Sequence, residues 1–151
     1  MYSVLDGKTN ALTGAEMYRL ADTYAGDLGA LARMPLQRFH RRIASIPFRT
    51  DAQIFTGPEE QNDEGLKRPA MLLKEPALDC KKKNLLMGAW AKQNGVPFRF
   101  VAISEKRNGK IHHVMTQLLL NGQWTNADAT LPTDRIGGAK PGVTRAMELL
   151  R

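Results

Sequence analysis

The chain contains little cysteine and little histidine. Cys80 is the one cysteine among 151 residues, and three histidines are spread along the sequence. A single cysteine cannot close an intrachain disulfide, and so few ligands exclude a cysteine-rich zinc site. The acidic stretch at 59–64 lacks the ligand spacing of a calcium loop. We therefore expect neither a metal site nor a cofactor.

Long apolar runs are also missing. No stretch approaches the ~18 apolar residues that a membrane-spanning helix needs. Residues 1–6 have neither the basic nor the apolar region of a secretory signal. We therefore expect no membrane partner and a cytoplasmic location.

Acidic residues are outnumbered by basic ones. The chain has 15 Asp and Glu against 22 Lys and Arg, which gives a formal net charge of +7. Basic chains bind nucleic acid or acidic partners. The densest basic cluster contains Arg38, His40, Arg41, Arg42 and Arg49. It lacks the interleaved aromatic residues of a single-strand binder and matches no helix-turn-helix or zinc-finger pattern. Two interpretations of this Arg38–Arg49 cluster stay open. It could bind an acidic partner or nucleic acid, or it could be a basic surface that only maintains solubility.

The overall composition is that of an ordinary globular protein. Hydrophobic residues make up 42% of the chain and charged residues 25%. A chain of this length suits one domain with one core. We see no internal repeat and no low-complexity tract, and we predict a single domain over 1–151.

A helix is predicted near the beginning of the chain. Thr13 and Glu16 have the spacing of a capping box. Apolar residues then recur at every third or fourth position, which predicts an amphipathic helix over 14–33 after an irregular arm. Gly26 and Gly29 weaken this helix and mark a close helix contact or a break.

A second helix begins at Pro35 and ends at Pro47, so the helical N-terminal part spans 14–47. The polar, turn-prone sequence at 56–65 predicts a long loop. A short buried segment is expected at Met71–Leu73.

The centre of the chain predicts a helix followed by three strands. The apolar pattern of the helix, over 80–93, stops at Asn94-Gly95, which is typical of a helix C-terminus. The strands are separated by Asn-Gly pairs that favour tight hairpins, and they lie at 96–103, 111–120 and 123–129. This order predicts an α+β fold in which N-terminal helices and a central cysteine-bearing helix pack on a small antiparallel sheet. A short terminal helix is expected at 143–150.

Cys80 lies at the N-terminus of the predicted central helix. Unpaired amide groups and the helix dipole favour a thiolate there. Lys81, Lys82 and Lys83 add positive charge in the same turn. This pattern favours a reactive thiol, and the alternative is a small buried hydrophobic residue.

Two further residues fit such a thiol, because a cysteine nucleophile needs a base and a group that orients the base. His113 and Asp128 follow Cys80 on two successive predicted strands, which a tight turn places side by side. Adjacent strand residues point to opposite faces, so His112 is expected to face solvent. Trp124 should share a sheet face with Asp128 and shield the site from water. Taken alone, Asp128 would be a strand-end hydrogen bonder and Trp124 an ordinary core residue.

Four short blocks carry a resemblance to a known family. They are Asp79-Cys80 at a helix start, Gly95-Val96-Pro97-Phe98-Arg99 in a strand, His113-Val114, and Trp124 ahead of Asp128-Ala129-Thr130. Their order over residues 69–131 resembles the transglutaminase-like core. This papain-like cysteine fold occurs in transglutaminases, peptide N-glycanases, microbial peptidases and phage proteins. The short chain is most similar to the compact phage and bacterial forms.

The resemblance implies a thiol acyl transfer on a protein or peptide substrate. Cys80 would be the nucleophile, His113 the general base and acid, and Asp128 the residue that orients His113. The backbone N–H of Cys80 and the side chain of Gln61 would stabilise the oxyanion. The thioester would pass to water in hydrolysis or to an amine in cross-linking. A phage-encoded form would act in the host cytoplasm or in association with the virion.

Two other functions stay open. The same fold could serve as a binding or structural protein, such as a phage component, that keeps the triad without catalysis. The positive charge also allows a nucleic-acid-associated protein.

Overall fold

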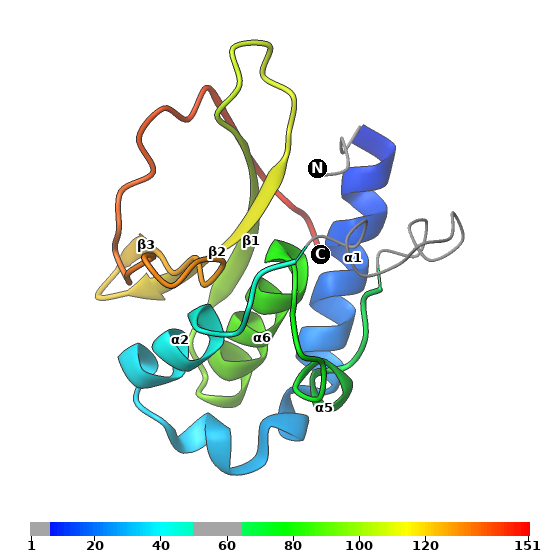
Figure 1. Ribbon diagram of the computed structural model, residues 1–151, viewed down its shortest axis with the longest axis vertical. Helices are drawn as coiled ribbons and strands as arrows, with labels where there is room; N and C mark the ends of the chain where they lie inside the picture. Colours follow the sequence, from blue (N-terminus) through cyan, green and yellow to red (C-terminus); the bar gives the residue numbers. More distant parts are fainter. Residues whose placement is uncertain (1–6, 50–64) are drawn as a thin grey trace.

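The computed structural model describes residues 7–49 and 65–151, with the backbone alone for 7–12. The fold is α+β and consists of helices packed on one side of a small curled antiparallel sheet (Figure 1). The elements in chain order are α1 (Gly7–Thr23), η1 (Ala25–Arg33), α2 (Leu36–Ala44), α5 (Pro69–Leu72), α6 (Cys80–Gln93), β1 (Phe98–Ser104), β2 (His113–Leu120), β3 (Gln123–Asn126) and β4 (Arg145–Glu148). No helix in the described part of the chain is long and apolar enough to cross a membrane.

The sheet has four antiparallel strands in the order β3-β2-β1-β4. The predicted β2–β3 hairpin is confirmed, with Leu120 opposite Gln123. Asn121 and Gly122 both have positive φ angles, 51° and 76°. This conformation matches the right-handed twist of the strands and is favoured by Asn-Gly.

The predicted C-terminal helix at 143–150 is wrong. Arg145–Glu148 form β4, which pairs with the free edge of β1. The Leu149 N–H continues this pairing and donates to the Phe100 carbonyl at 2.8 Å. A short apolar run does not separate helix from strand by its pattern. The unpaired edge of β1 decides the outcome, because its backbone groups need partners.

The first helix also differs from its prediction. α1 begins at Gly7, within the stretch predicted as irregular, and ends at Thr23. Thr13 therefore lies inside the helix, where it is buried, and is not a cap. η1 follows and is interrupted at Gly29, which has φ 54° and ψ −127°. Glycine adopts this conformation without the steric cost of a side chain, so Gly29 marks a break.

The second predicted helix is confirmed as α2, which follows Pro35. The short segment predicted at Met71–Leu73 overlaps α5, in which Leu72 is buried and Met71 is exposed. The predicted loop at 56–65 lies, except for Gly65, outside the described residues.

α6 forms the centre of the molecule and contacts β1 and β2 on one side and α1, η1 and α2 on others (Figure 1). Gly88 allows this close approach, because a Cβ there would lie 2.7 Å from the Phe100 ring. The Tyr18 hydroxyl of α1 accepts from the Phe100 N–H and donates to the Leu149 carbonyl, both at 2.8 Å. The Tyr18 bonds fix α1 against the sheet, while Asn84 in α6 is hydrogen-bonded to Val114 and Thr116, so the beginning of α6 lies beside the start of β2.

Candidate active site

Cys80 is the first residue of α6, as predicted. The Asp79 side chain caps the helix and accepts the Lys82 N–H at 2.9 Å. The remaining first-turn amides and the positive end of the helix dipole therefore lie at the cysteine. Cys80 is only 3% exposed, so little of its surface is open to a reagent.

The three lysines after Cys80 are buried and have partners of their own. Lys81 Nζ lies 3.9 Å from Asp79 Oδ2, and Lys82 Nζ lies 3.7 Å from Glu75 Oε2. Burial lowers the pKa of Lys83 to about 8. Its ammonium donates to the backbone carbonyls of Ala44, Ile46 and Thr130. These partners offset part of the lysine charge, which leaves less of it to act on the thiol than the sequence suggested.

The structure brings His113 and Asp128 together. His113 is the first residue of β2, and Asp128 follows the end of β3. His113 Nε2 and Asp128 Oδ2 are 2.6 Å apart, and the residues are 7% and 2% exposed. This short contact is a charge-assisted hydrogen bond shielded from water.

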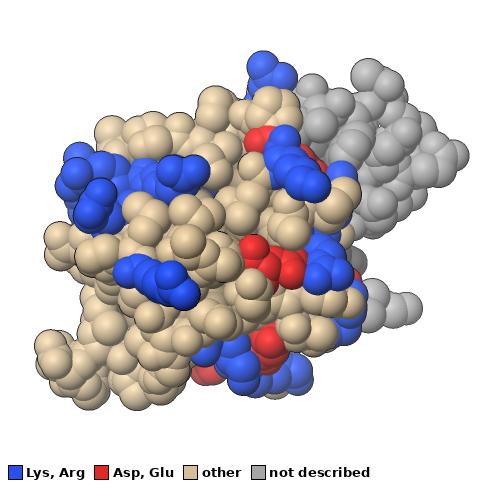
Figure 2. Space-filling view, turned by 90° about the horizontal axis from the view of Figure 1, so that it is seen from below, with Lys and Arg blue, Asp and Glu red and all other residues tan. Residues whose placement is uncertain are grey.

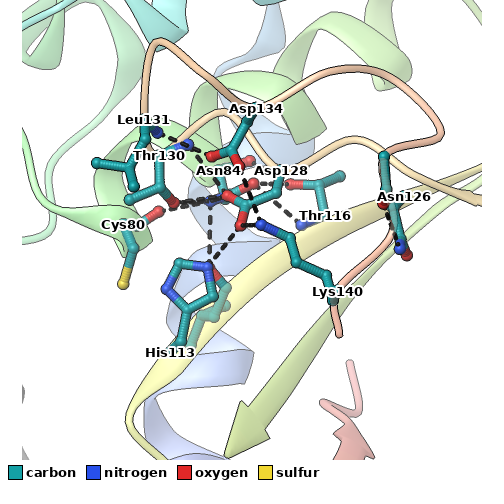
Figure 3. A network of polar contacts seen from close by, with 12 residues as sticks. Cys80, Asn84, His113, Thr116, Asn126, Asp128, Thr130, Leu131, Asp134 and Lys140 are labelled. Atoms are coloured by element: carbon teal, nitrogen blue, oxygen red, sulfur yellow. Dashed lines mark hydrogen bonds and ion pairs between the residues drawn. The ribbon is translucent and has the colours of Figure 1, made fainter. Parts of the chain in front are cut away.

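Cys80 lies next to the other ring nitrogen of His113, Nδ1 (Figure 3). Burial lowers the pKa of His113, but hydrogen bonds to Asp128 and Cys80 and the charges of both groups raise it to about 10. Burial raises the pKa of the Asp128 carboxyl, but His113 and Lys140 hold it well below its usual range. At neutral pH the site therefore holds an imidazolium between the Asp128 carboxylate and Cys80.

This pairing predicts a pH-dependent contribution of His113 to stability. Folding raises the pKa of His113 from 6.5 to about 10. The contribution is therefore complete below pH 6.5 and is lost as the pH rises through about 10. We expect the difference in melting temperature between the wild type and His113→Gln to be largest near pH 6 and to shrink up to pH 10. A difference that stays constant over this range in thermal unfolding would show that His113 does not gain its partners on folding.

The neighbouring His112 has a different hydrogen-bond partner from His113. Its side chain is half-buried, and its Nε2 accepts the Glu105 N–H at 2.9 Å. Burial lowers the pKa of His112. His112 therefore braces the β1–β2 turn, while His113 pairs with Asp128.

Asp128 receives hydrogen bonds on both of its carboxylate oxygens. Oδ2 lies 2.7 Å from Lys140 Nζ in addition to its contact with His113. Oδ1 accepts the Thr130 N–H at 3.0 Å, the Thr130 hydroxyl at 2.5 Å and Asn84 Nδ2 at 3.2 Å. A carboxylate with this many donors stays ionised and has a fixed orientation.

Asn84 connects this carboxylate to the helix and the sheet. It is fully buried, and its Nδ2 lies 2.9 Å from the Cys80 carbonyl and 3.1 Å from the Val114 carbonyl. Its Oδ1 accepts from both the N–H and the hydroxyl of Thr116, at 3.0 and 2.9 Å. One side chain therefore sets the position of Asp128 relative to α6 and β2.

Lys140 reaches the site from the loop at 131–142. Its Nζ contacts Asp134 Oδ1 at 3.0 Å as well as Asp128. The loop is held by β3, because the Gly137 N–H donates to the Asn126 carbonyl at 2.7 Å. A hollow of about 130 Å³ lies beside this ammonium and is lined in part by Asp128 and Asp134.

The two predicted binding residues lie apart from these contacts or outside the structure. Trp124 is 40% exposed, and the Arg99 guanidinium lies 4.3 Å from the centre of its ring. Arg99 in turn donates to Gln117 at 2.8 Å. The indole is thus part of a polar surface on the sheet near the β2–β3 hairpin. Gln61 lies outside the described residues.

The basic cluster on α2 divides into an outer and an inner part. Arg38, Arg41 and Arg42 are exposed and line a shallow hollow of about 210 Å³. No ion pair joins them to a carboxylate within 7–49 or 65–151. His40 is buried, and its Nε2 lies 2.6 Å from the Asp128 carbonyl. The face seen in Figure 2 has some Lys and Arg side chains beside carboxylates and others with none. Binding of nucleic acid or an acidic partner here stays a prediction.

Within the described ranges, no group of three or more His, Cys, Asp or Glu residues could hold a metal ion. Comparisons of the chain with models of known protein families, with curated proteins and with solved structures found no match.

The sequence prediction missed three residues around Asp128. Asn84 is four residues after Cys80 and so lies on the same helix face, which is a signal that could have identified it. His40 and Lys140 have no such signal, because their partners are far away in the sequence. His40 was assigned to the basic surface instead, and it is buried.

Proposed function

We propose that the protein is a cysteine-dependent amide hydrolase or acyltransferase that acts on a protein or peptide through a thioester on Cys80. The observation that carries this proposal is the 2.6 Å hydrogen bond between His113 and Asp128, together with the placement of the other His113 nitrogen on the side of Cys80 (Figure 3). A cysteine at a helix N-terminus, with a histidine at the start of one strand and an acid just after the end of the neighbouring strand, also fits the resemblance to a transglutaminase-like core. A compact papain-like core is therefore part of the proposal.

The first half of the reaction forms the thioester. The Cys80 thiolate attacks the carbonyl carbon of the substrate amide, and a tetrahedral oxyanion forms. The His113 imidazolium then donates its proton to the departing nitrogen, and the C–N bond breaks. The Cys80 N–H has no intrahelical partner in the first turn of α6 and would stabilise the oxyanion.

The second half releases the acyl group. His113, now neutral, takes a proton from water or from an amine as either attacks the thioester carbonyl. The C–S bond breaks, and the thiolate–imidazolium pair returns. Water gives a carboxylic acid and an amine gives a new amide, so hydrolysis and transfer share every residue of the site.

A small activated ester tests this proposal. We expect p-nitrophenyl acetate to acylate Cys80, because its acyl group is small enough for a thiol that is 3% exposed. The wild type should release a burst of about one equivalent of p-nitrophenol, followed by slower turnover. Stopped-flow absorbance measures the burst, and mass spectrometry locates the acetyl group. Added cadaverine distinguishes the two reactions, since transfer gives acetylcadaverine and hydrolysis gives acetate.

His112→Gln is the matched control, because it removes a neighbouring histidine that does not contact Asp128, and it should retain the burst. Cys80→Ala should abolish the burst. A wild type that never becomes acetylated on Cys80, or a burst that survives Cys80→Ala, contradicts the proposal. A binding or structural protein on the same fold would then be the better description.

A further inference from the structure

Two cations share one oxygen of the Asp128 carboxylate. His113 Nε2 lies 2.6 Å and Lys140 Nζ 2.7 Å from Oδ2 (Figure 3). The Lys140 side chain is 21% exposed, and that of Asp128 is 2% exposed. The lysine ammonium and the imidazolium therefore contact the same carboxylate oxygen. The site is largely buried, so the charges in it are only weakly screened.

The charged and titratable groups around His113 come from every neighbouring element. Cys80 lies at the start of α6, Asp128 follows β3, and the His112 ring centre is 6.5 Å from that of His113. Lys140 comes from the loop at 131–142 and shares the Asp128 Oδ2 oxygen with His113. Asp134, which also binds Lys140, keeps the ammonium charged and in place.

We propose that Lys140 is a positioning residue that shares Asp128 with His113 and thereby makes the imidazole easier to deprotonate during thioester breakdown. This role depends on the proposed acyl transfer. If the carboxylate bound His113 alone, its full negative charge would act on the ring, and His113 would hold its proton more tightly. Lys140 takes up part of the carboxylate charge and repels a proton on His113.

This effect matters at one step of the reaction. Once the thioester has formed, the Cys80 thiolate no longer stabilises the imidazolium. His113 must then be neutral, because it has to take the proton of the attacking water or amine. Lys140 therefore favours breakdown of the thioester, whereas attack by the thiolate needs no deprotonated histidine.

Three variants of Lys140 separate its charge from its hydrogen bond. Lys140→Gln keeps an N–H donor but loses the charge, Lys140→Met loses both, and Lys140→Arg keeps both. We expect the first two to slow deacylation of the p-nitrophenyl acetate adduct about tenfold at pH 7, with its pH midpoint moved upward, and to leave the burst intact. Lys140→Arg should behave like the wild type. Lys92→Gln, near the far end of α6, controls for net charge.

Titration of the His113 ring by NMR provides a readout that does not need catalysis. The titration midpoint of His113 should move to higher pH in Lys140→Gln and Lys140→Met. In Lys140→Arg it should equal the wild-type midpoint. An unchanged midpoint, or equal losses of burst and deacylation without a pH change, would falsify the role of Lys140. If no acyl-enzyme forms but the midpoint moves, Lys140 acts on His113 as inferred and only the proposed reaction fails.

Discussion

Replacing Asn84 with leucine is expected to lower the free energy of unfolding by about 3 kcal/mol or more, because it leaves several buried polar groups without partners. Leucine has a similar size, so the change creates little cavity. It removes the donor to the Val114 carbonyl and to Asp128 and the acceptor for the Thr116 N–H. Each unsatisfied buried group costs about 1–3 kcal/mol, against a total stability of about 5–15 kcal/mol for a typical domain.

Urea unfolding of Asn84→Leu measures this loss. Gln93→Leu is the matched control, since Gln93 is an exposed residue at the end of the same helix. The control should stay within about 0.5 kcal/mol of the wild type. If Asn84→Leu also stays within that limit, Asn84 does not hold the helix, the sheet and Asp128 together.

Local signals predicted the part of the fold that surrounds the cysteine. The apolar pattern over 80–93 predicted the start of α6 at Cys80, where the structure shows that the Asp79 side chain caps the helix. Its end follows from Asn94-Gly95, where Gly95 has φ 68°. The Asn121-Gly122 turn determines which strands are neighbours, and hence that His113 and Asp128 can meet.

Features that depend on distant partners were not predictable. β4 forms because β1, more than 40 residues earlier, offers an edge. The sequence predicted that Lys83 adds positive charge beside Cys80. In the structure its ammonium is instead enclosed by backbone carbonyls from α2 and from Thr130. The role of Lys140 depends on a loop that folds back onto β3, and no residue near it in the sequence indicates its contact with Asp128.

His113 is expected to control the reactivity of Cys80. Its pKa of about 10 keeps the ring protonated across the neutral range, and an adjacent imidazolium stabilises a thiolate. We expect the rate at which the wild type reacts with iodoacetamide to change less with pH than the rate for His113→Gln. His113→Gln should react at least about tenfold more slowly at pH 7 and accelerate as the pH rises, like an ordinary thiol. His112→Gln should follow the wild type.

The most direct test of the thiolate–imidazolium pair is this alkylation rate of Cys80 against pH. Labelling is followed by intact-protein mass spectrometry, and the same protein in urea gives the rate of the fully exposed thiol. The pair predicts a flatter profile for the wild type than for His113→Gln. Two profiles that rise together with pH would contradict it, because Cys80 would then react without help from His113.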